Sequence, residues 1–309
     1  MGVLALIWGG RGKRFFVPTY IVVYLAAYFA LAGVGIAYAN SADANSAAAL
    51  HAQYDLLKEK LSHNLLHNLL KKPLYMESRA SSGAVAGEIY GLINHPFGIV
   101  NAALNAPVNW CDILILHLNI KSCRAAAETQ GSILKVHIGK KYDQPLDKSY
   151  RVNFAFHVAV KTLNYLQVSL NADKGPISTR NYRIMFEAVP LNDKQTFIHF
   201  SFSYAYGLTG RIAMQAYLNT IGHSKVGFTV IGQHADGQPI YIDGMRGLVE
   251  RNAMRYYLAI EVFLSTLSVP PQKQLEKRLH DWFTAVEAYP RQLHELEQQK
   301  YLEMKLRSK

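Results

Sequence analysis

The twelve histidines of this sequence are candidates for acid–base chemistry near neutral pH and for metal binding, but their spacing forms no known site. His63 and His67 lie four residues apart in HNLLH, on one face of a predicted helix. The segment lacks the glutamate of a metalloprotease helix and has no third ligand nearby, so we interpret the two as a surface pair. His137, His157 and His199 fall in predicted strands, opposite the apolar side chains or at their edge, and we expect them to face solvent. The sequence therefore predicts no metal site.

The motifs of common enzyme classes are missing from the sequence. It contains no glycine-rich phosphate loop, no Gly-x-Ser-x-Gly elbow and no HExxH. The segment from Asn109 to Asp112 is the densest in functional groups. Trp110 is a candidate to close the mouth of a cavity, and Asp112 could pair with Arg151 or Arg183. The other interpretation is a structural corner. We expect no catalytic residue and no cofactor, and an enzyme is kept as an alternative.

Positive charge is scattered through the chain rather than gathered in a nucleic-acid-binding module. The formal net charge is +11, without Arg-Gly runs, so we expect no nucleic acid partner. Such basicity suits anionic lipid headgroups or plain solubility. Arg251 and Arg255 lie one helical turn apart and could grip a carboxylate or phosphate. Ion pairs with Glu250 or Glu261 are the favoured interpretation.

The N-terminal segment is typical of an export signal. A basic cluster, Arg11 to Arg14, precedes 25 residues without charge from Phe15 to Ala39. Ala37 to Ala39 matches a small-x-small cleavage pattern, so residues 1–39 are predicted to be a signal peptide cleaved after Ala39. A run of this length could also stay in the bilayer as an anchor. The body is therefore expected in the periplasm, either released or tethered to the inner membrane.

Cys111 and Cys123 are the only cysteines. Outside the cytoplasm an even count favours a disulfide between them, which would pin the corner around Trp110. Two buried thiols are the alternative.

Helical and strand periodicities succeed one another along the body. We predict a helix over 48–71, a strand pair over 74–93, helices over 96–115 broken near Pro107, and alternating strands from Ser132. After Gly207 come a helix to about Thr220, a hairpin, a helix over 250–267 and a helical stretch over 272–309 broken at Pro290. Its charge-laced last part is typical of a solvated or partner-binding helix.

The alternating strands predict an antiparallel meander with one wet and one unusually aromatic face. The aromatic positions are candidates to line a ligand cavity, with a solid core as the alternative. They are Phe154, Phe156, Tyr182, Phe186, Phe200, Phe202 and Tyr204. Arg183 and Glu187 share one side of a strand. Pointing inward, Arg183 would hold a ligand headgroup, and pointing outward it would belong to a solvated face.

From 74 to 264 the order of elements resembles the START-like, helix-grip superfamily. GEIYGLINHPFGIVNAALNAPVNWCDILI is similar to its first strand and first helices, and the strand at 201–206 is similar to its last. The resemblance implies an α+β fold in which a curved antiparallel sheet wraps a long helix. The helix from Leu208 would fill the grip, or else the helix after Glu250. It also implies a hydrophobic ligand such as a lipid or sterol, and related folds host cyclases.

These observations predict a signal segment at 1–39, a linker at 40–50, a START-like domain at 51–267 and a C-terminal helical extension at 268–309. We expect an exported protein that binds a hydrophobic small molecule or lipid, contacts a membrane surface and carries its ligand across the periplasm. One alternative is a structural or assembly protein of the cell envelope that docks a protein partner through its C-terminal helix. The other is a cyclase-like enzyme on the same fold.

Overall fold

The computed structural model describes residues 43, 45–63, 70, 72–129, 131–220 and 222–307. The predicted export segment, with its cleavage position at Ala39, lies outside these residues. Of the helices in these ranges, none combines the length and the apolar character needed to cross a bilayer. The described residues from 47 onwards form one compact unit. The helix predicted over 48–71 already runs over 45–63, so it includes half of the predicted linker at 40–50.

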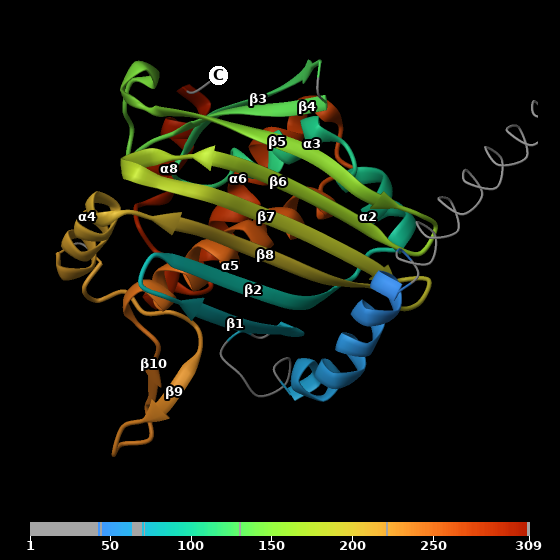
Figure 1. Ribbon diagram of the computed structural model, residues 1–309, viewed down its shortest axis with the longest axis horizontal. Helices are drawn as coiled ribbons and strands as arrows, with labels where there is room; N and C mark the ends of the chain where they lie inside the picture. The colour runs from blue at the N-terminus through green and yellow to red at the C-terminus, as the bar shows by residue number, and fades with distance from the viewer. Residues whose placement is uncertain are drawn as a thin grey trace, which may run out of the picture. The chain divides into compact units, whose positions relative to one another are not determined.

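One antiparallel sheet of eight strands organises the described part of the chain (Figure 1). Its spatial order is β1-β2-β8-β7-β6-β5-β4-β3. The strands are β1 (Leu74–Ala80), β2 (Ala84–Ile93), β3 (Ile120–Glu128), β4 (Gly131–Ile138), β5 (Tyr150–Lys161), β6 (Leu166–Lys174), β7 (Thr179–Pro190) and β8 (Thr196–Tyr206). The predicted strand pair and meander are present. Strand β3 was not predicted, because IKSCRAAAE shows no apolar alternation.

Alternation along each strand divides the sheet into two different faces. In β7, Ile184 and Phe186 enter the main core, whereas Arg183 points to the other side and is half exposed. In register with them on β8 lie Phe202 and Phe200. The aromatic face is therefore the concave, covered one, as the sequence indicates.

Helix α5 (Gly244–Ser265) fills the grip. Its side chains are buried on almost every side, because the sheet covers one flank and later helices cover the other. Helix α4 (Leu208–Asn219), which directly follows the last strand, buries only Gly210 among its residues. The prediction that the helix from Leu208 fills the grip is wrong, and the alternative after Glu250 is correct.

Two short helices cross the concave side between β2 and β3. They are α2 (Phe97–Leu104) and α3 (Pro107–Leu114), and the chain breaks before Pro107 as predicted. The Cys111–Cys123 disulfide joins α3 to β3 across a Cα–Cα distance of 5.1 Å, which confirms the predicted pairing. This bond fixes the helix against the edge of the sheet.

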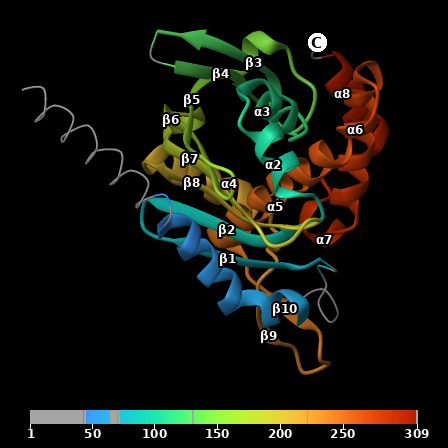
Figure 2. The ribbon, with the colours of Figure 1, turned by 90° about the vertical axis from the view of Figure 1, so that its right-hand side faces the viewer.

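The C-terminal stretch forms α6 (Pro271–Glu287), α7 (Pro290–Leu293) and α8 (Gln298–Arg307), with the predicted break at Pro290. Figure 2 shows α6 and α8 beyond α5, on the side away from the sheet. Trp282, Tyr301 and Met304 belong to the main core. The charge-laced last helix is therefore not simply solvated, because one of its faces is buried.

Two further elements flank this body. The helix over 47–63 packs Leu50, Leu57 and Leu61 against Phe197 and its neighbours on the convex face of the sheet, forming a second apolar cluster. The predicted hairpin after Val226 is β9 (Val230–Gln233) and β10 (Pro239–Tyr241). It extends away from the sheet (Figure 1).

Candidate functional site

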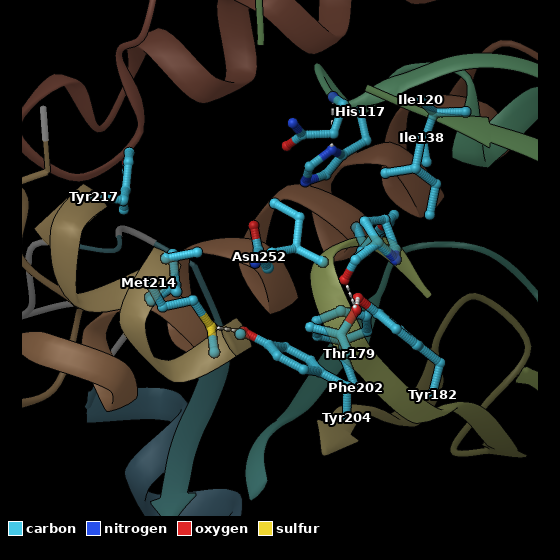
Figure 3. A pocket seen from close by; sticks show the side chains of 17 residues that line it. His117, Ile120, Ile138, Thr179, Tyr182, Phe202, Tyr204, Met214, Tyr217 and Asn252 are labelled. Carbon is cyan, nitrogen blue, oxygen red and sulfur yellow. Dashed lines mark hydrogen bonds between the residues drawn. The ribbon is translucent and has the colours of Figure 1, made fainter. Parts of the chain in front are cut away.

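A cavity of about 280 Å³ lies at one end of the grip, among β7, β8, α4 and α5. Its sheet wall is aromatic: Tyr182, Phe202 and Tyr204 point into it (Figure 3). Met214 of α4 and Tyr256 of α5 face them. Tyr182 stacks on Tyr204 at 5.3 Å, and the Tyr204 hydroxyl donates to the Met214 sulfur at 3.5 Å. Burial raises the pKa of both tyrosines, so both stay neutral.

The mouth of the cavity lies beside a short 3-10 turn, Pro176–Ser178. Ile177 and Ser178 have φ of 51° and 59°, a region that β-branched residues such as isoleucine avoid. Helix α4 rests on this turn at Gly210, where an added Cβ would lie 3.0 Å from the Ile177 carbonyl oxygen. Ile177 is exposed, as are Leu208 and Ile212 on the adjacent helix. Of these three, Ile177 lines the cavity, whereas Leu208 and Ile212 lie on the face of α4 turned away from it.

The opposite end of the cavity is polar. His117 lies in the turn between α3 and β3, and its ring stacks on Tyr256 at 4.7 Å. Burial, followed by the charge of Arg255, lowers the pKa of His117 well below its ordinary value, so the ring is neutral. The backbone N–H of Asn119 donates to its Nδ1 at 3.2 Å, which leaves the proton on Nε2. Within the described residues, Nε2 is buried without a hydrogen-bond partner.

Only three of the predicted ligand-binding residues line this cavity, namely Tyr182, Phe202 and Tyr204. The other predicted aromatics, Phe154, Phe156, Phe186 and Phe200, are buried in the main core and do not line the cavity. These four side chains pack in the core of the described chain, and this cavity lies at one end of the aromatic face.

Trp110 and Arg183 also lie away from the cavity. Trp110 is buried, donates to the Leu104 carbonyl oxygen at 2.8 Å and meets Phe186 edge to face. Arg183 lies on the convex face and reaches Asp173 at 3.8 Å. Asp112 pairs with Arg278 at 2.8 Å rather than with Arg151 or Arg183. The corner around Trp110 is therefore structural.

His199 is buried, which corrects the expectation that it faces solvent. Its Nδ1 lies 2.8 Å from Glu187 and its Nε2 3.3 Å from Glu88, while its ring stacks on Tyr90 at 4.3 Å. Arg79 also donates to Glu88. His157 is exposed, as predicted, and His137 is partly buried against Ser122.

The histidine between two carboxylates is strongly polarised. Burial would lower the pKa of His199, but its hydrogen bonds to Glu187 and Glu88 outweigh burial and raise that pKa to about 9. In turn, the hydrogen bond from His199 holds the pKa of Glu88 at about 2. This network lies on the convex face, away from the cavity, and joins three strands. We assign it a structural role.

Sequence patterns did not predict the polar residues at the cavity. His117 and Asn119 lie in an irregular turn, and Asn252 lies on a helix whose exposed and buried sides could not be told apart. The spacing of Arg251 and Arg255, one helical turn apart, is the sequence signal that indicates positive charge near this site. Metal ligation has no support here, since the described ranges contain no cluster of three histidine, cysteine or acidic side chains able to hold an ion.

The described chain has an α+β helix-grip fold, the START-like architecture that the element order predicts. Besides the stretch from β2 to β8 and the grip helix α5, the described chain has the first strand β1, the segment of α4, β9 and β10 before α5, and the helices α6, α7 and α8 after α5.

Comparisons with known proteins find likeness at the level of the fold alone. No protein-family model and no curated protein matches the chain. A conserved protein from Geobacillus kaustophilus is 13% identical, covering 59% of this chain and 95% of its own, with a TM-score of 0.34. A START superfamily protein from Mycobacterium smegmatis is 14% identical, and the match covers 48% of this chain and 90% of that protein, with a TM-score of 0.31. The Zhui aromatase/cyclase from Streptomyces is 12% identical, and the match covers 70% of this chain and 96% of that protein, with a TM-score of 0.30.

Proposed function

We propose that this protein binds a compact hydrophobic molecule in the cavity at the end of its grip. The observation that carries the proposal is the lining: aromatic and aliphatic side chains from the sheet, α4 and α5 make up most of the cavity wall. The hydroxyls of Tyr182 and Tyr204 are bonded to Thr179 and Met214, and the other polar side chains of the lining include His117 and Asn252. Binding sites for small ligands are mostly apolar with a few placed polar groups. Each methylene moved from water to such a wall contributes roughly 0.8 kcal/mol.

The size of the cavity limits the ligand. At about 280 Å³ it lies at the lower end of the range for small-molecule sites, which begins at roughly 300 Å³. A single-chain amphiphile or a compact ring system fits this volume better than a lipid with two acyl chains.

We further propose that the protein works outside the cytoplasm and exchanges its ligand with a membrane surface. The disulfide favours an oxidising compartment, in line with the export segment expected at 1–39. Leu208 and Ile212 are 74% and 58% exposed on α4, on the face turned away from the residues of this helix that line the cavity. Contact of this apolar face with a membrane would bring the cavity close to the bilayer. Expression of the full chain in a bacterial host, followed by fractionation and N-terminal sequencing, tests export and cleavage after Ala39.

Filling the cavity tests the binding proposal. Ala213 lines the cavity on α4, whereas Ala216 on the same helix is exposed. Ala213→Trp should abolish displacement of an environment-sensitive fluorescent fatty-chain probe, and Ala216→Trp should leave it unchanged. Native mass spectrometry should show a bound small molecule in the wild type and none in Ala213→Trp. Equal probe binding by the two variants would refute a ligand in this cavity.

A further inference from the structure

A group of buried and partly buried basic side chains lies behind the polar end of the cavity. This cationic cluster consists of Lys141, Lys225, Arg251 and Arg255. Arg251 and Arg255 are 0% and 1% exposed. Among the described residues, one carboxylate lies with them, that of Glu295, which pairs with Lys141 at 2.5 Å and with Arg255 at 2.8 Å. Positive charge is therefore in excess.

Arg251 is the least satisfied member of the cationic cluster. Its Nη1 donates to the Val226 carbonyl oxygen at 3.3 Å, but within the described residues its Nε and Nη2 have no hydrogen-bond partner. The expected ion pairs with Glu250 and Glu261 do not form. Glu250 accepts from Ser78 and Thr229, and Glu261 pairs with Lys72. A buried guanidinium that shares one carboxylate, that of Glu295, with three other cations is costly, and such costs are tolerated mainly where function requires them.

Two residues connect the cationic cluster to the cavity. Tyr217 lines the cavity, and its hydroxyl accepts from Lys141 at 2.7 Å. Asn252 also lines the cavity, and its side-chain oxygen lies 3.5 Å from Arg255 Nη1. On the same wall, His117 presents the buried, unpartnered Nε2. Figure 3 shows His117 and Asn252 at one end of the cavity, across from Phe202 and Tyr204.

We propose that the ligand is an amphiphile with an anionic oxygen headgroup, a carboxylate or a phosphate, bound at the His117–Asn252–Tyr217 end under the positive field of the cationic cluster. Its apolar part would lie against Tyr182, Phe202 and Tyr204. The Nε2–H of His117 and the amide of Asn252 would donate to the headgroup, and Arg251 and Arg255 would balance its charge. This inference rests on the proposed function and names its ligand class.

Four ligands that share one chain length test the headgroup: decanoate, decyl phosphate, decan-1-ol and decyltrimethylammonium. Competition against the fluorescent probe measures the affinity of each ligand. One or both anions should bind most tightly, the alcohol about tenfold more weakly and the cation most weakly. The two anions compared with each other identify the headgroup. Equal binding of alcohol and anions would overturn this inference and leave the hydrophobic-ligand proposal standing. Failure of all four to compete would overturn both.

A pair of arginine variants separates binding from folding. Arg251→Met should reduce the preference for the better anion over decan-1-ol by about tenfold and leave the melting temperature unchanged or higher, because a buried unpaired charge is removed. Arg278 is equally buried but fully partnered by Asp112, Gln274 and Thr266. Arg278→Met should lower the melting temperature and keep the preference. A lower melting temperature with an unchanged preference in Arg251→Met would give Arg251 a structural role and overturn the inference.

Discussion

At the scale of single residues, burial and partners decide the role of each histidine more than its strand position does. His117 and His199 are both buried, but one lies without a carboxylate at a cavity and is neutral, whereas the other lies between two carboxylates and is charged. The same side chain therefore serves as a candidate hydrogen-bond donor to a ligand in one place and as a cationic cross-link in the other.

The His199 network makes stability depend on pH in a defined window. The pKa of His199 rises from 6.5 to about 9 on folding, so its contribution is complete below pH 6.5 and is lost as the pH rises through about 9. The pKa of Glu88 falls from 4.5 to about 2, so its contribution is complete above pH 4.5 and is lost as the pH falls through about 2. This network alone gives the free energy of unfolding a component that is highest between pH 4.5 and 6.5 and then decreases, by on the order of 3 kcal/mol, towards pH 9 and above. The pKa values of Lys121 and Lys141, lowered to about 8, give every variant a component of opposite slope there, so chemical denaturation should measure the network as the difference between wild type and His199→Gln.

His199→Gln should flatten this alkaline decrease and lower stability at pH 6, because Glu88 and Glu187 would then face each other without the shared cation. His157→Gln, an exposed change on β5, is the matched control and should keep the wild-type profile. An alkaline decrease of wild-type size in His199→Gln would show that other groups cause it.

At the scale of elements, local pattern predicts the strands well but not the position of the grip helix. Ile184, Phe186, Phe200 and Phe202 alternate with polar neighbours, and their strands are where the sequence predicts them. Helix α4 follows the last strand directly and therefore resembles the grip helix in sequence order. Local pattern predicts the hairpin and the second helix as well, but it does not show which of the two helices the sheet wraps. Cavity residues escaped prediction for the same reason: long-range packing, rather than periodicity, leaves one end of the aromatic face unfilled.

Helix α4 lines the cavity with one face, and the exposed apolar residues on its other face should act in membrane exchange. Leu208→Ser with Ile212→Ser should slow ligand transfer from vesicles of phosphatidylcholine and phosphatidylglycerol by about fivefold or more, because two side chains that enter the interface are lost. Stopped-flow energy transfer from a labelled fatty-chain ligand measures this rate. Affinity for ligand in detergent-free buffer should change little.

The hairpin supplies the matched control for that experiment. Val230 and Ile231 are 50% and 59% exposed on β9, away from the cavity lining. Val230→Ser with Ile231→Ser should leave the transfer rate at its wild-type value. Equal slowing by both double variants would mean that general surface hydrophobicity, and not the apolar face of α4, promotes membrane contact.

At the scale of the whole molecule, the last helix supports the turn that carries the candidate site. Lys305 donates to the carbonyl oxygens of His117 and Ile120 at 2.6 and 2.7 Å, and Tyr301 donates to that of Leu116 at 2.8 Å. Residues almost 190 positions apart are thereby joined. Removal of α8 after Glu297 should therefore destabilise the fold and abolish probe binding. A free docking element would leave both unchanged.

Single substitutions on α8 test the same connection without removing the helix. Lys305→Met should lower the free energy of unfolding by about 1–3 kcal/mol, since two buried carbonyl oxygens lose their donor, and should weaken ligand binding because the turn at His117 loosens. Burial lowers the pKa of Lys305 well below its ordinary value, which reduces the cost of losing its charge, so the loss reports mainly on hydrogen bonding. Lys300 is exposed on the same helix, and Lys300→Met should change neither quantity. Thermal unfolding and probe titration measured together decide the matter: a stable Lys305→Met variant with wild-type affinity would separate α8 from the site.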